Sequence, residues 1–291
     1  MRKGIILAGG SGSRLSPLTF SVTKQLLPIH DKPMIYYPLS TLLELDLTEI
    51  LIITTNEDKH QFQNLLGDGS SIGINISYET QDKPNGIAEG LIIAHKFLDN
   101  EPCVFILGDN LFVGSINPHN LKNKLSATEG ATIFTYKVRD PERYGVVSIN
   151  KKNEPIEIIE KPKNPISNHA ITGLYLYDKH AYNIAKTLKP SNRNELEITD
   201  VNKYYLKNKM LSIIPIDEDI TWLDAGTISS LYEATNFVSA IEKRTGKKIA
   251  CIEEIAFTKK RINIDKLIKA RTRYGKSEYG VYLQCIIDKN C

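Results

Sequence analysis

Short apolar runs alternate with longer amphipathic stretches in the first part of the chain. The strand candidates there are Gly4–Ala8, Ile50–Thr55, Ile74–Glu79 and Val104–Leu107. The first two contain uninterrupted apolar segments rather than alternating residues, which predicts that both of their faces are covered. The pattern therefore favours a largely parallel sheet packed between helices.

Helical periodicity fills the intervals between these runs. Pro33 suits the first position of a helix, whose apolar stripe would be formed by Met34, Ile35, Pro38, Leu39, Leu42 and Leu43. Asn85 can cap a second helix, which would carry Ile87, Leu91, Ile92 and Ala94. Strands and helices that alternate in this way predict a Rossmann-like, doubly wound α/β fold with a mostly parallel sheet.

The second half of the chain has strand candidates with less helix between them. They are Thr132–Val138, Tyr144–Ile149, Ile156–Glu160 and Ile171–Tyr177. Further on, Asn194 with Glu197 three residues later predicts the start of a helix, and two C-terminal helices are expected at 228–243 and 264–270. No internal repeat or low-complexity linker interrupts the chain. The simplest account is one α/β core with an inserted substrate-binding β layer.

The composition is that of an ordinary globular protein. Of the 291 residues, 41% are hydrophobic and 24% are charged. The 37 Lys and Arg residues nearly balance the 34 Asp and Glu residues, so the formal net charge is only +3. This balance argues against a nucleic acid as partner, whereas a small phosphorylated ligand needs only a local cluster of cations.

The cysteines and the N-terminal segment indicate in which cellular compartment the protein is expected. Cys103, Cys251, Cys285 and Cys291 have no CxxC spacing, so we interpret them as reduced thiols of a cytosolic protein. The apolar part of the N-terminus ends at the glycines after Ala8 and is too short for a signal peptide or a membrane span. We expect a cytoplasmic protein that does not bind membranes.

A glycine-rich segment, LAGGSGSRL at residues 7–15, follows the first strand candidate. Its glycines let backbone N–H groups approach a phosphate closely, and Arg14 can add a fork of donors. The segment lacks the Gly-Lys-Ser/Thr ending of a P-loop, and Leu15 stands where a dinucleotide-binding fingerprint needs its third glycine. A tight turn without any ligand is the alternative. Arg14 and the KQLLP segment at residues 24–28 favour phosphate binding.

The glycine-rich segment, continued by Pro17 and Thr19, and the KQLLP segment resemble the signature of the sugar-nucleotide pyrophosphorylases. The segments KPMIYYPLS at 32–40, DPERYGVV at 140–147 and ELEITD at 195–200 resemble one branch of them, the bacterial glucose-1-phosphate thymidylyltransferases. The resemblance implies a Mg²⁺-dependent enzyme that transfers a thymidylyl group from dTTP to α-D-glucose 1-phosphate and releases pyrophosphate. The product, dTDP-glucose, would be the starting compound for dTDP-deoxysugars such as dTDP-L-rhamnose.

The same resemblance implies an organisation for the whole chain. One nucleotidyltransferase domain would cover residues 1–291, with a nucleotide-binding core at about 1–110, a sugar-binding part at about 111–227 and a helical region at about 228–291. A homotetramer is usual in the family, and an end-product sugar nucleotide can inhibit from a second site. Residues 251–257 resemble part of that site, although Ile252 replaces a usual proline and Thr258 a usual arginine.

Two aspartates, Asp109 and Asp224, follow apolar strand candidates. The carboxyl ends of parallel strands line a ligand crevice, and a carboxylate there can hold Mg²⁺. Taken alone, each aspartate is more often a turn or helix-cap residue. The matching aspartates of the resembling family bind the catalytic Mg²⁺ together, which makes Asp109 and Asp224 the expected metal ligands. The family also implies catalytic roles for Arg14, Lys24 and Lys161.

The resemblance further divides the site into a nucleotide part and a sugar part. Nucleotide contacts are expected from Leu7, Gly9, Gly10, Ser11, Gly12, Ser13, Gln81, Pro84, Gly86 and Asp109. Contacts to the sugar phosphate are expected from Gly145, Glu160, Lys161, Thr172, Gly173 and Arg193. A glutamine amide can both donate to and accept from a pyrimidine edge. Near Gln81, Asn85 and Glu89 depart from the usual residues of the family.

Other functions compete with this interpretation. A uridylyltransferase or another hexose-1-phosphate nucleotidyltransferase would need the same phosphate chemistry. A nucleotide-sugar-binding protein without activity would not need two metal carboxylates. A nicotinamide-dependent dehydrogenase is disfavoured by the missing third glycine. The sequence therefore favours a nucleotidyltransferase.

Overall fold

The computed structural model describes all residues except 1, 11, 115–120, 122–123, 128 and 291. Its largest sheet has nine strands, in the order β10-β9-β11-β6-β1-β4-β5, with β8 joining β11 to β12. Seven strands run along this path: β1 (Lys3–Leu7), β4 (Glu49–Thr54), β5 (Asn75–Thr80), β6 (Cys103–Leu107), β9 (Gly145–Ile149), β10 (Pro155–Glu160) and β11 (His169–Tyr177). The other two are β8 (Ala131–Lys137) and β12 (Leu211–Pro215).

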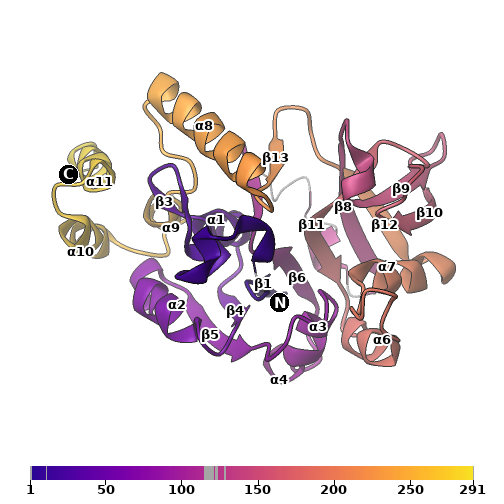
Figure 1. The fold of residues 1–291 in the computed structure, drawn as a ribbon. Helices are drawn as coiled ribbons and strands as arrows, with labels where there is room; N and C mark the ends of the chain where they lie inside the picture. The colour runs from indigo at the N-terminus through magenta and orange to yellow at the C-terminus, as the bar shows by residue number, and fades with distance from the viewer. Residues whose placement is uncertain (1, 11, 115–120, 122–123, 128, 291) are drawn as a thin grey trace.

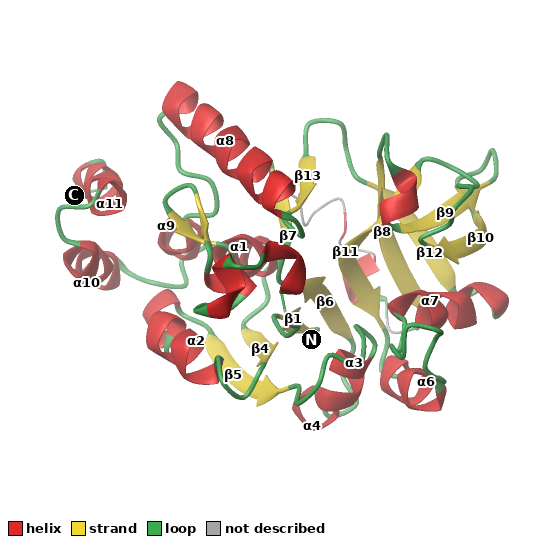
Figure 2. Cartoon of the chain, in the orientation of Figure 1, coloured by secondary structure: helices red, strands yellow, loops and turns green. Residues whose placement is uncertain are grey.

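The described helices lie around this sheet and to one side of it, with the last two of the chain at the left edge of the view (Figures 1 and 2). They are α1 (Tyr36–Glu44), α2 (Lys59–Leu66), α3 (Glu89–Ile93), α4 (His95–Leu98), α6 (Ala181–Thr187), α7 (Ile198–Lys207), α8 (Ile228–Thr245), α9 (Ile252–Thr258), α10 (Ile264–Tyr274) and α11 (Glu278–Asp288). Two small antiparallel pairs complete the fold: β2 (Pro28–Ile29) with β3 (Lys32–Pro33), and β7 (Asn110–Val113) with β13 (Thr221–Asp224). No helix in the described part of the chain is long and apolar enough to cross a membrane.

The sheet is covered on both faces, as the uninterrupted apolar strands predict. On one face Ile6 packs in a core with Leu39 and Leu42 of α1, and on the other Ile5 shares a core with Leu91 of α3. Strands β6, β1, β4 and β5 run parallel to one another. The predicted doubly wound α/β fold is confirmed, and the second half adds antiparallel strands, beginning with β11 against β6.

Three predicted helix starts are wrong, because a strand pairing, a turn or a later cap residue is found at these positions instead. Pro33 lies in β3, since the following amide of Met34 donates to the carbonyl of Leu27, and α1 begins only at Tyr36. Asn85 does not cap α3, whose N-cap is Ala88. Asn194 occupies a turn with φ 59°, and Glu197 is the N-cap of α7.

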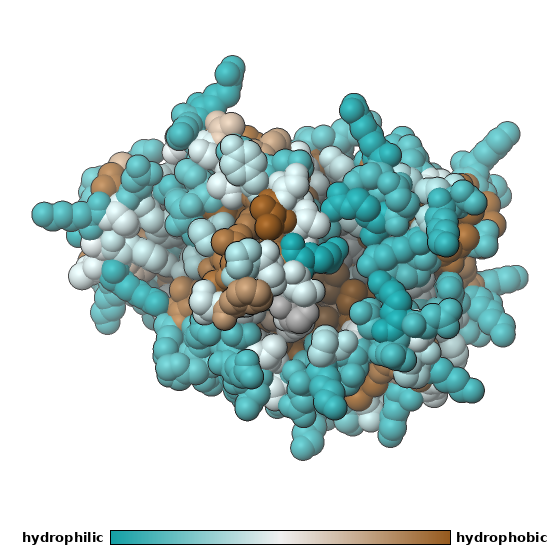
Figure 3. Space-filling model, in the orientation of Figure 1, coloured by the Kyte–Doolittle hydropathy of each residue, from teal (hydrophilic) through white to brown (hydrophobic). Residues whose placement is uncertain are grey.

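The topology creates a crevice between two strands. From β1 the chain moves to β4 and β5 on one side and then returns to β6 on the other. Loops that leave the carboxyl ends of β1 and β6 therefore diverge, which is the usual place for a ligand in this fold. The space-filling view has a hollow near its centre, between the part that carries α1 to α3 and the part that carries β9 and β10 (Figure 3).

The cysteines lie away from one another. Cys103 and Cys251 are buried and Cys285 is exposed, and all three are free. Burial raises the pKa of the Cys103 thiol to about 12, so it behaves as a small apolar residue. The fourth cysteine, Cys291, lies outside the described residues.

Candidate active site

The glycine-rich segment leaves the carboxyl end of β1 and turns back over the sheet. Gly10 and Gly12 have φ angles of 109° and 59°, which a residue with a Cβ adopts at a cost. A Cβ on Gly12 would also lie 2.8 Å from the Thr19 side chain, whose hydroxyl donates to the Gly12 carbonyl. Thr19 thus fixes the loop, and Gly10 keeps open space beside its backbone. Ser11 lies outside the described residues.

A cleft of about 450 Å³ opens over this loop. Most of the residues predicted to bind the nucleotide line it, together with the two predicted phosphate-binding lysines and Arg193. The predicted residues in its wall are Leu7, Gly9, Gly10, Gly12, Ser13, Arg14, Lys24, Gln81, Pro84, Gly86, Asp109, Lys161 and Arg193. We call it the nucleotide cleft. Residues separated by more than a hundred positions are therefore brought together at the crevice that the strand order creates.

A second cavity, of about 160 Å³, adjoins the nucleotide cleft. Its wall includes Gly145, Glu160, Gly173, Trp222 and Asp224. We call it the sugar cavity. Five residues line both cavities: Arg14, Ile87, Leu107, Asp109 and Lys161. The shared wall therefore carries two cations and one carboxylate.

Asp109 follows the end of β6 and is paired with a lysine from the segment after β1. The Lys24 ammonium donates to Oδ2 of Asp109, and both side chains are largely buried. Burial alone would raise the pKa of Asp109, but the charge and hydrogen bond of Lys24 hold this pKa below its usual value. Asp109 is therefore an ionised carboxylate at neutral pH.

Asp224 reaches the same place from the end of β13. The antiparallel pairing of β13 with β7 sets Asp224 opposite Asn110, and the next amide, of Ala225, donates to the Asp109 carbonyl at 3.0 Å. Burial, together with repulsion from Asp109, raises the pKa of Asp224 to about 6. The cation paired with Asp224 is Arg143, 3.8 Å away.

Asn110 holds Asp109 in place, a role that the sequence did not suggest. Its amide nitrogen donates to Oδ1 of Asp109 at 2.9 Å, and its oxygen accepts from Trp222 Nε1 and from the amide of Gly173. A Cβ on Gly173 would lie 2.6 Å from Asn110. An amide directly after a strand-end aspartate is the only signal in the sequence that could have pointed to this role.

The sugar cavity is polar at one end. Glu160 accepts a hydrogen bond from the Thr199 hydroxyl and forms an ion pair with Arg193 at 3.3 Å. A Cβ on Gly145 would lie 3.1 Å from Glu160 Oε2, so glycine leaves that oxygen open to the cavity. Thr172 does not line either cavity: its side chain is fully buried on the opposite face of β11, while Ile171 and Gly173 face the sugar cavity.

Arg193 is held mainly by one carboxylate. Its Nε and Nη2 donate to the two oxygens of Glu197 at 3.1 and 2.7 Å. The same Nη2 lies 3.6 Å from Glu195. Lys161 follows β10 with φ 41°, and its ammonium is 4.0 Å from Glu160. Both predicted phosphate contacts therefore border the nucleotide cleft, with Arg193 oriented by Glu197.

Several residues of the two cavities were missed by the sequence prediction. Arg143, Glu197, Thr199 and Trp222 all line the sugar cavity. Arg143, Glu197 and Thr199 lie in segments that carry the resemblance and Trp222 does not, but neither periodicity nor spacing separates any of them from its neighbours. Strand register and helix orientation, which are tertiary properties, aim these side chains at the cavity.

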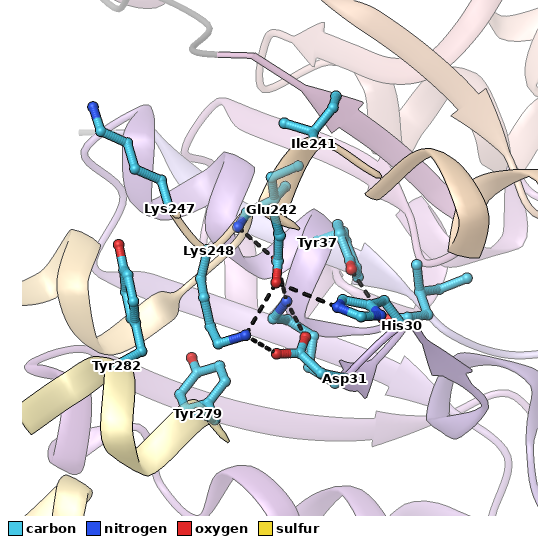
Figure 4. Close-up of polar contacts among 12 residues, drawn as sticks. His30, Asp31, Tyr37, Ile241, Glu242, Lys247, Lys248, Tyr279 and Tyr282 are labelled. Carbon is cyan, nitrogen blue, oxygen red and sulfur yellow. Dashed lines mark hydrogen bonds and ion pairs between the residues drawn. The ribbon is translucent and has the colours of Figure 1, made fainter. Parts of the chain in front are cut away.

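A second group of acidic side chains lies away from the crevice. His30, Asp31 and Glu242 offer ligand atoms within 4.8 Å of one another. Lysines already occupy this group (Figure 4). Lys32 lies 2.5 Å from Asp31 and 2.9 Å from Glu242, and Lys248 contacts the same two carboxylates. We call Asp31, Lys32, Glu242 and Lys248 the structural charge cluster, since their charges compensate one another.

Comparison with known proteins agrees with the geometry. The sequence model of the family described as Nucleotidyl transferase matches residues 3–241. The chain is 47% identical over 287 residues to a glucose-1-phosphate thymidylyltransferase of Neisseria meningitidis serogroup A / serotype 4A, covering 99% of this chain and 100% of that protein. It is 43% identical to the protein of the same name from Mycobacterium tuberculosis, again over 99% of this chain and 100% of the relative.

A solved structure shows the same architecture. The complex of a UDP-glucose pyrophosphorylase with UDP-glucose has a TM-score of 0.71 and 26% sequence identity. It covers 84% of this chain and 99% of that one. The match of fold, family model and full-length relatives shows that the chain belongs to the nucleotidyl transferase family.

Proposed function

We propose that the protein transfers a thymidylyl group from dTTP to α-D-glucose 1-phosphate, giving dTDP-glucose and pyrophosphate. One observation carries the proposal: the nucleotide cleft and the sugar cavity share a wall that contains Arg14, Lys161 and Asp109. A nucleoside triphosphate over the glycine loop and a sugar phosphate beside Glu160 would therefore meet at two cations. The names of the relatives supply the thymidylyl group and glucose 1-phosphate.

The two carboxylates fit a magnesium ion. Asp109 and Asp224 offer hard oxygen donors, and the amide of Ala225, next to Asp224, donates to the Asp109 carbonyl at 3.0 Å, which holds the two segments together. When bound, Mg²⁺ would neutralise phosphate charge and polarise the α-phosphate. Asn110 would keep Asp109 oriented for this task.

The remaining steps follow from the protein's own residues. The phosphate oxygen of the sugar phosphate attacks the α-phosphorus in line, and the bond from that phosphorus to the β-phosphate oxygen breaks. No protein nucleophile is needed because the attacking group is already an anion, so orientation and charge neutralisation carry the catalysis. Lys161 and Arg193 would hold the sugar phosphate, Lys24 would offset phosphate repulsion, and Arg14 would stabilise the departing pyrophosphate.

The sugar and the base would be recognised at opposite ends of the site. Glu160 and the backbone beside Gly145 would accept and donate hydrogen bonds to hexose hydroxyls. Gln81, Pro84 and Gly86 would surround the pyrimidine. We expect UTP to be a weaker substrate than dTTP. Uracil lacks the methyl group of thymine, which is worth about 1 kcal/mol in an apolar pocket, and UTP carries an additional ribose hydroxyl.

A substrate panel tests the proposed function. Pyrophosphate release is measured with dTTP, UTP and dATP against several hexose 1-phosphates at saturating Mg²⁺, and the products are identified by mass spectrometry. The expected result is the highest kcat/KM with dTTP and glucose 1-phosphate. Equal use of dATP and dTTP would contradict the base assignment, and no release with any pair would contradict the reaction class.

We also propose that the chain forms a single domain and assembles as a homotetramer in the cytoplasm, as the sequence predicts. Its product would supply the synthesis of dTDP-deoxysugars, and an end product of that synthesis would inhibit the enzyme at a second site. Support for the second site is a cavity of about 1120 Å³ whose wall includes Glu254, Phe257, Thr258 and Lys260. Lys259 is paired with Asp46 instead, at 3.4 Å.

Inhibition at the second site should be weak. Thr258 cannot make the charge-assisted contact of an arginine, and losing one such contact lowers affinity roughly ten- to a hundredfold. We expect inhibition by dTDP-L-rhamnose well above the low micromolar range, tightened by Thr258→Arg with no change in KM for either substrate. Strong inhibition of the unaltered protein would point to Lys260 as the replacing cation. A changed KM in the variant would place this segment at the active site.

A further inference from the structure

The side chain of Gln81 is fixed in one orientation. It is only 5% exposed, and its amide nitrogen donates to Glu89 Oε2 at 2.6 Å and to the Gly86 carbonyl at 3.2 Å. A carboxylate and a carbonyl can only accept hydrogen bonds. The end of the Gln81 amide that lies between Glu89 and Gly86 must therefore be the nitrogen. The hydrogen-bond partners alone give this assignment of the amide oxygen and nitrogen.

This arrangement sends the amide oxygen of Gln81 toward the nucleotide cleft. A Cβ built on Gly9 would lie 2.7 Å from Oε1 of Gln81, and both residues line the cleft. The hydrogen bonds described for Gln81 all use its nitrogen, and both hydrogens of that nitrogen have acceptors. A base in the cleft consequently faces a hydrogen-bond acceptor.

Glu89 is itself held in place. Its second oxygen accepts from the Asn85 side chain at 2.8 Å, and it is the first residue of α3. The adjacent backbone is tied to the segment before α7, because Ala88 donates to the carbonyl of Leu196 at 3.0 Å and Leu196 donates to that of Asn85 at 2.6 Å. The loop cannot shift to relieve a wrong amide orientation without breaking these bonds.

We propose that Glu89 is a specificity-determining positioning residue, which fixes Gln81 so that the cleft accepts a pyrimidine with an N–H donor at N3. This inference rests on the proposed function. The N3–H of thymine or uracil satisfies the Gln81 oxygen, whereas cytosine presents an acceptor at N3 and leaves two acceptors opposed. A neutral amide at position 89 can either donate or accept, so only the Gly86 carbonyl would then favour the amide nitrogen, and Gln81 could turn over more easily to present its nitrogen to cytosine.

The variant Glu89→Gln tests this role in the full-length protein. Pyrophosphate release from dTTP and dCTP is measured in competition, with glucose 1-phosphate and Mg²⁺. Because a charge-assisted hydrogen bond is about twice as strong as a neutral one, we expect the ratio of kcat/KM for dTTP to that for dCTP to fall about tenfold. The change should come from KM rather than from kcat.

A control separates charge from orientation. Asp82→Asn removes one negative charge from an exposed residue of the same loop and should leave the ratio unchanged. If Glu89→Gln does not fold, Asn85→Ala releases one Glu89 oxygen at constant charge and should lower the ratio about threefold. An unchanged ratio in the folded Glu89→Gln protein, or in Asn85→Ala where that is the variant tested, overturns the inference. Failure of the unaltered protein to use dTTP would instead overturn the proposed function.

Discussion

Two buried groups of opposite charges differ in how completely their charges are compensated. In the structural charge cluster, Asp31 and Glu242 each contact both Lys32 and Lys248. At the active site, Lys24 pairs with Asp109, while Asp224 has an ion pair with Arg143 at 3.8 Å. In the structural charge cluster each carboxylate has two lysine partners, whereas at the candidate active site Asp224 is only loosely paired.

The pKa values show the consequence. Burial alone would raise the pKa of Asp31, but hydrogen bonds from Lys248 and Lys32 hold it below its usual value. Burial and the neighbouring Asp109 raise the pKa of Asp224 to about 6. A set of oxygen and nitrogen atoms at metal-like spacing is therefore not sufficient for a metal site.

The largest effect should come from breaking the structural charge cluster. Lys32 is 1% exposed, and Lys32→Met would leave Asp31 and Glu242 facing each other with only Lys248 between them. Removing one partner of a buried ion pair typically costs about 3–5 kcal/mol. We expect that loss in the free energy of unfolding, measured by urea denaturation.

The matched control for Lys32→Met is an exposed ion pair. Lys203 lies 3.3 Å from Asp200 on the surface of α7. Lys203→Met should cost less than about 1 kcal/mol. Equal losses for the two variants would mean that the buried cluster is no more important for stability than a surface pair.

Removing a charge from the active site should affect turnover. Asp109→Asn keeps the shape of the side chain and its contact with Asn110 but removes the charge expected to hold Mg²⁺. We expect turnover to fall roughly 10²-fold or more, with the circular dichroism spectrum unchanged. Asp224→Asn should act alike, and the double variant should be no worse than additive if both bind one ion. Near-normal turnover at saturating Mg²⁺ would remove the altered residue from the site.

The smallest effect should be a gain in stability. Between its usual pKa and about 6, Asp224 binds more protons in the folded than in the unfolded state, so stability falls as pH rises through this range and stays lower above it. Asp224→Asn removes this penalty. In EDTA at pH 8 the variant should melt about 2 °C higher than the unaltered protein.

The pH dependence supplies the control for this gain. At pH 4.5 Asp224 is largely protonated in the folded protein but largely ionised in the unfolded chain, so part of the penalty remains and the gain should shrink to about a third of its size at pH 8. A gain of equal size at both pH values would mean that it does not arise from the Asp224 charge. A loss at pH 8 would show that the loose pair with Arg143 is stabilising after all.

Some elements of the fold are set by the local sequence, and others depend on contacts with other segments. The strands β1, β4 and β6 start and end within one residue of their predicted positions, because burial on both faces leaves an uninterrupted apolar run. The helix starts at Pro33, Asn85 and Asn194 were wrong. At each of them a turn or cap signal was outweighed by a backbone contact from another segment or by a turn of positive φ.

The residues of the candidate site also divide into those that the local sequence predicts and those whose position depends on the tertiary structure. The glycine loop could be proposed from the sequence because close approach to a phosphate would restrict which residues can stand there, and that restriction applies to consecutive positions. Asn110, Arg143 and Thr199 could not, because their orientation depends on strand register and on the packing of α7 against β10. Thr172 and Gly173 illustrate the limit: they are adjacent in sequence, and only the pleat of β11 decides which of them faces the cavity.

By itself, the sequence determined the fold class, and it predicted a phosphate-binding loop and two metal-binding carboxylates, since each prediction depends on local patterns of apolar, glycine and acidic residues. Only the tertiary structure decided which charges compensate one another. Lys24 and Asp109 are 85 positions apart, and Lys32 and Glu242 are 210 apart. Electrostatic interactions depend on distance and burial in space, which no short stretch of sequence records. The tertiary structure therefore makes one acidic group a cross-link between distant segments and leaves Asp224 of the other only loosely paired.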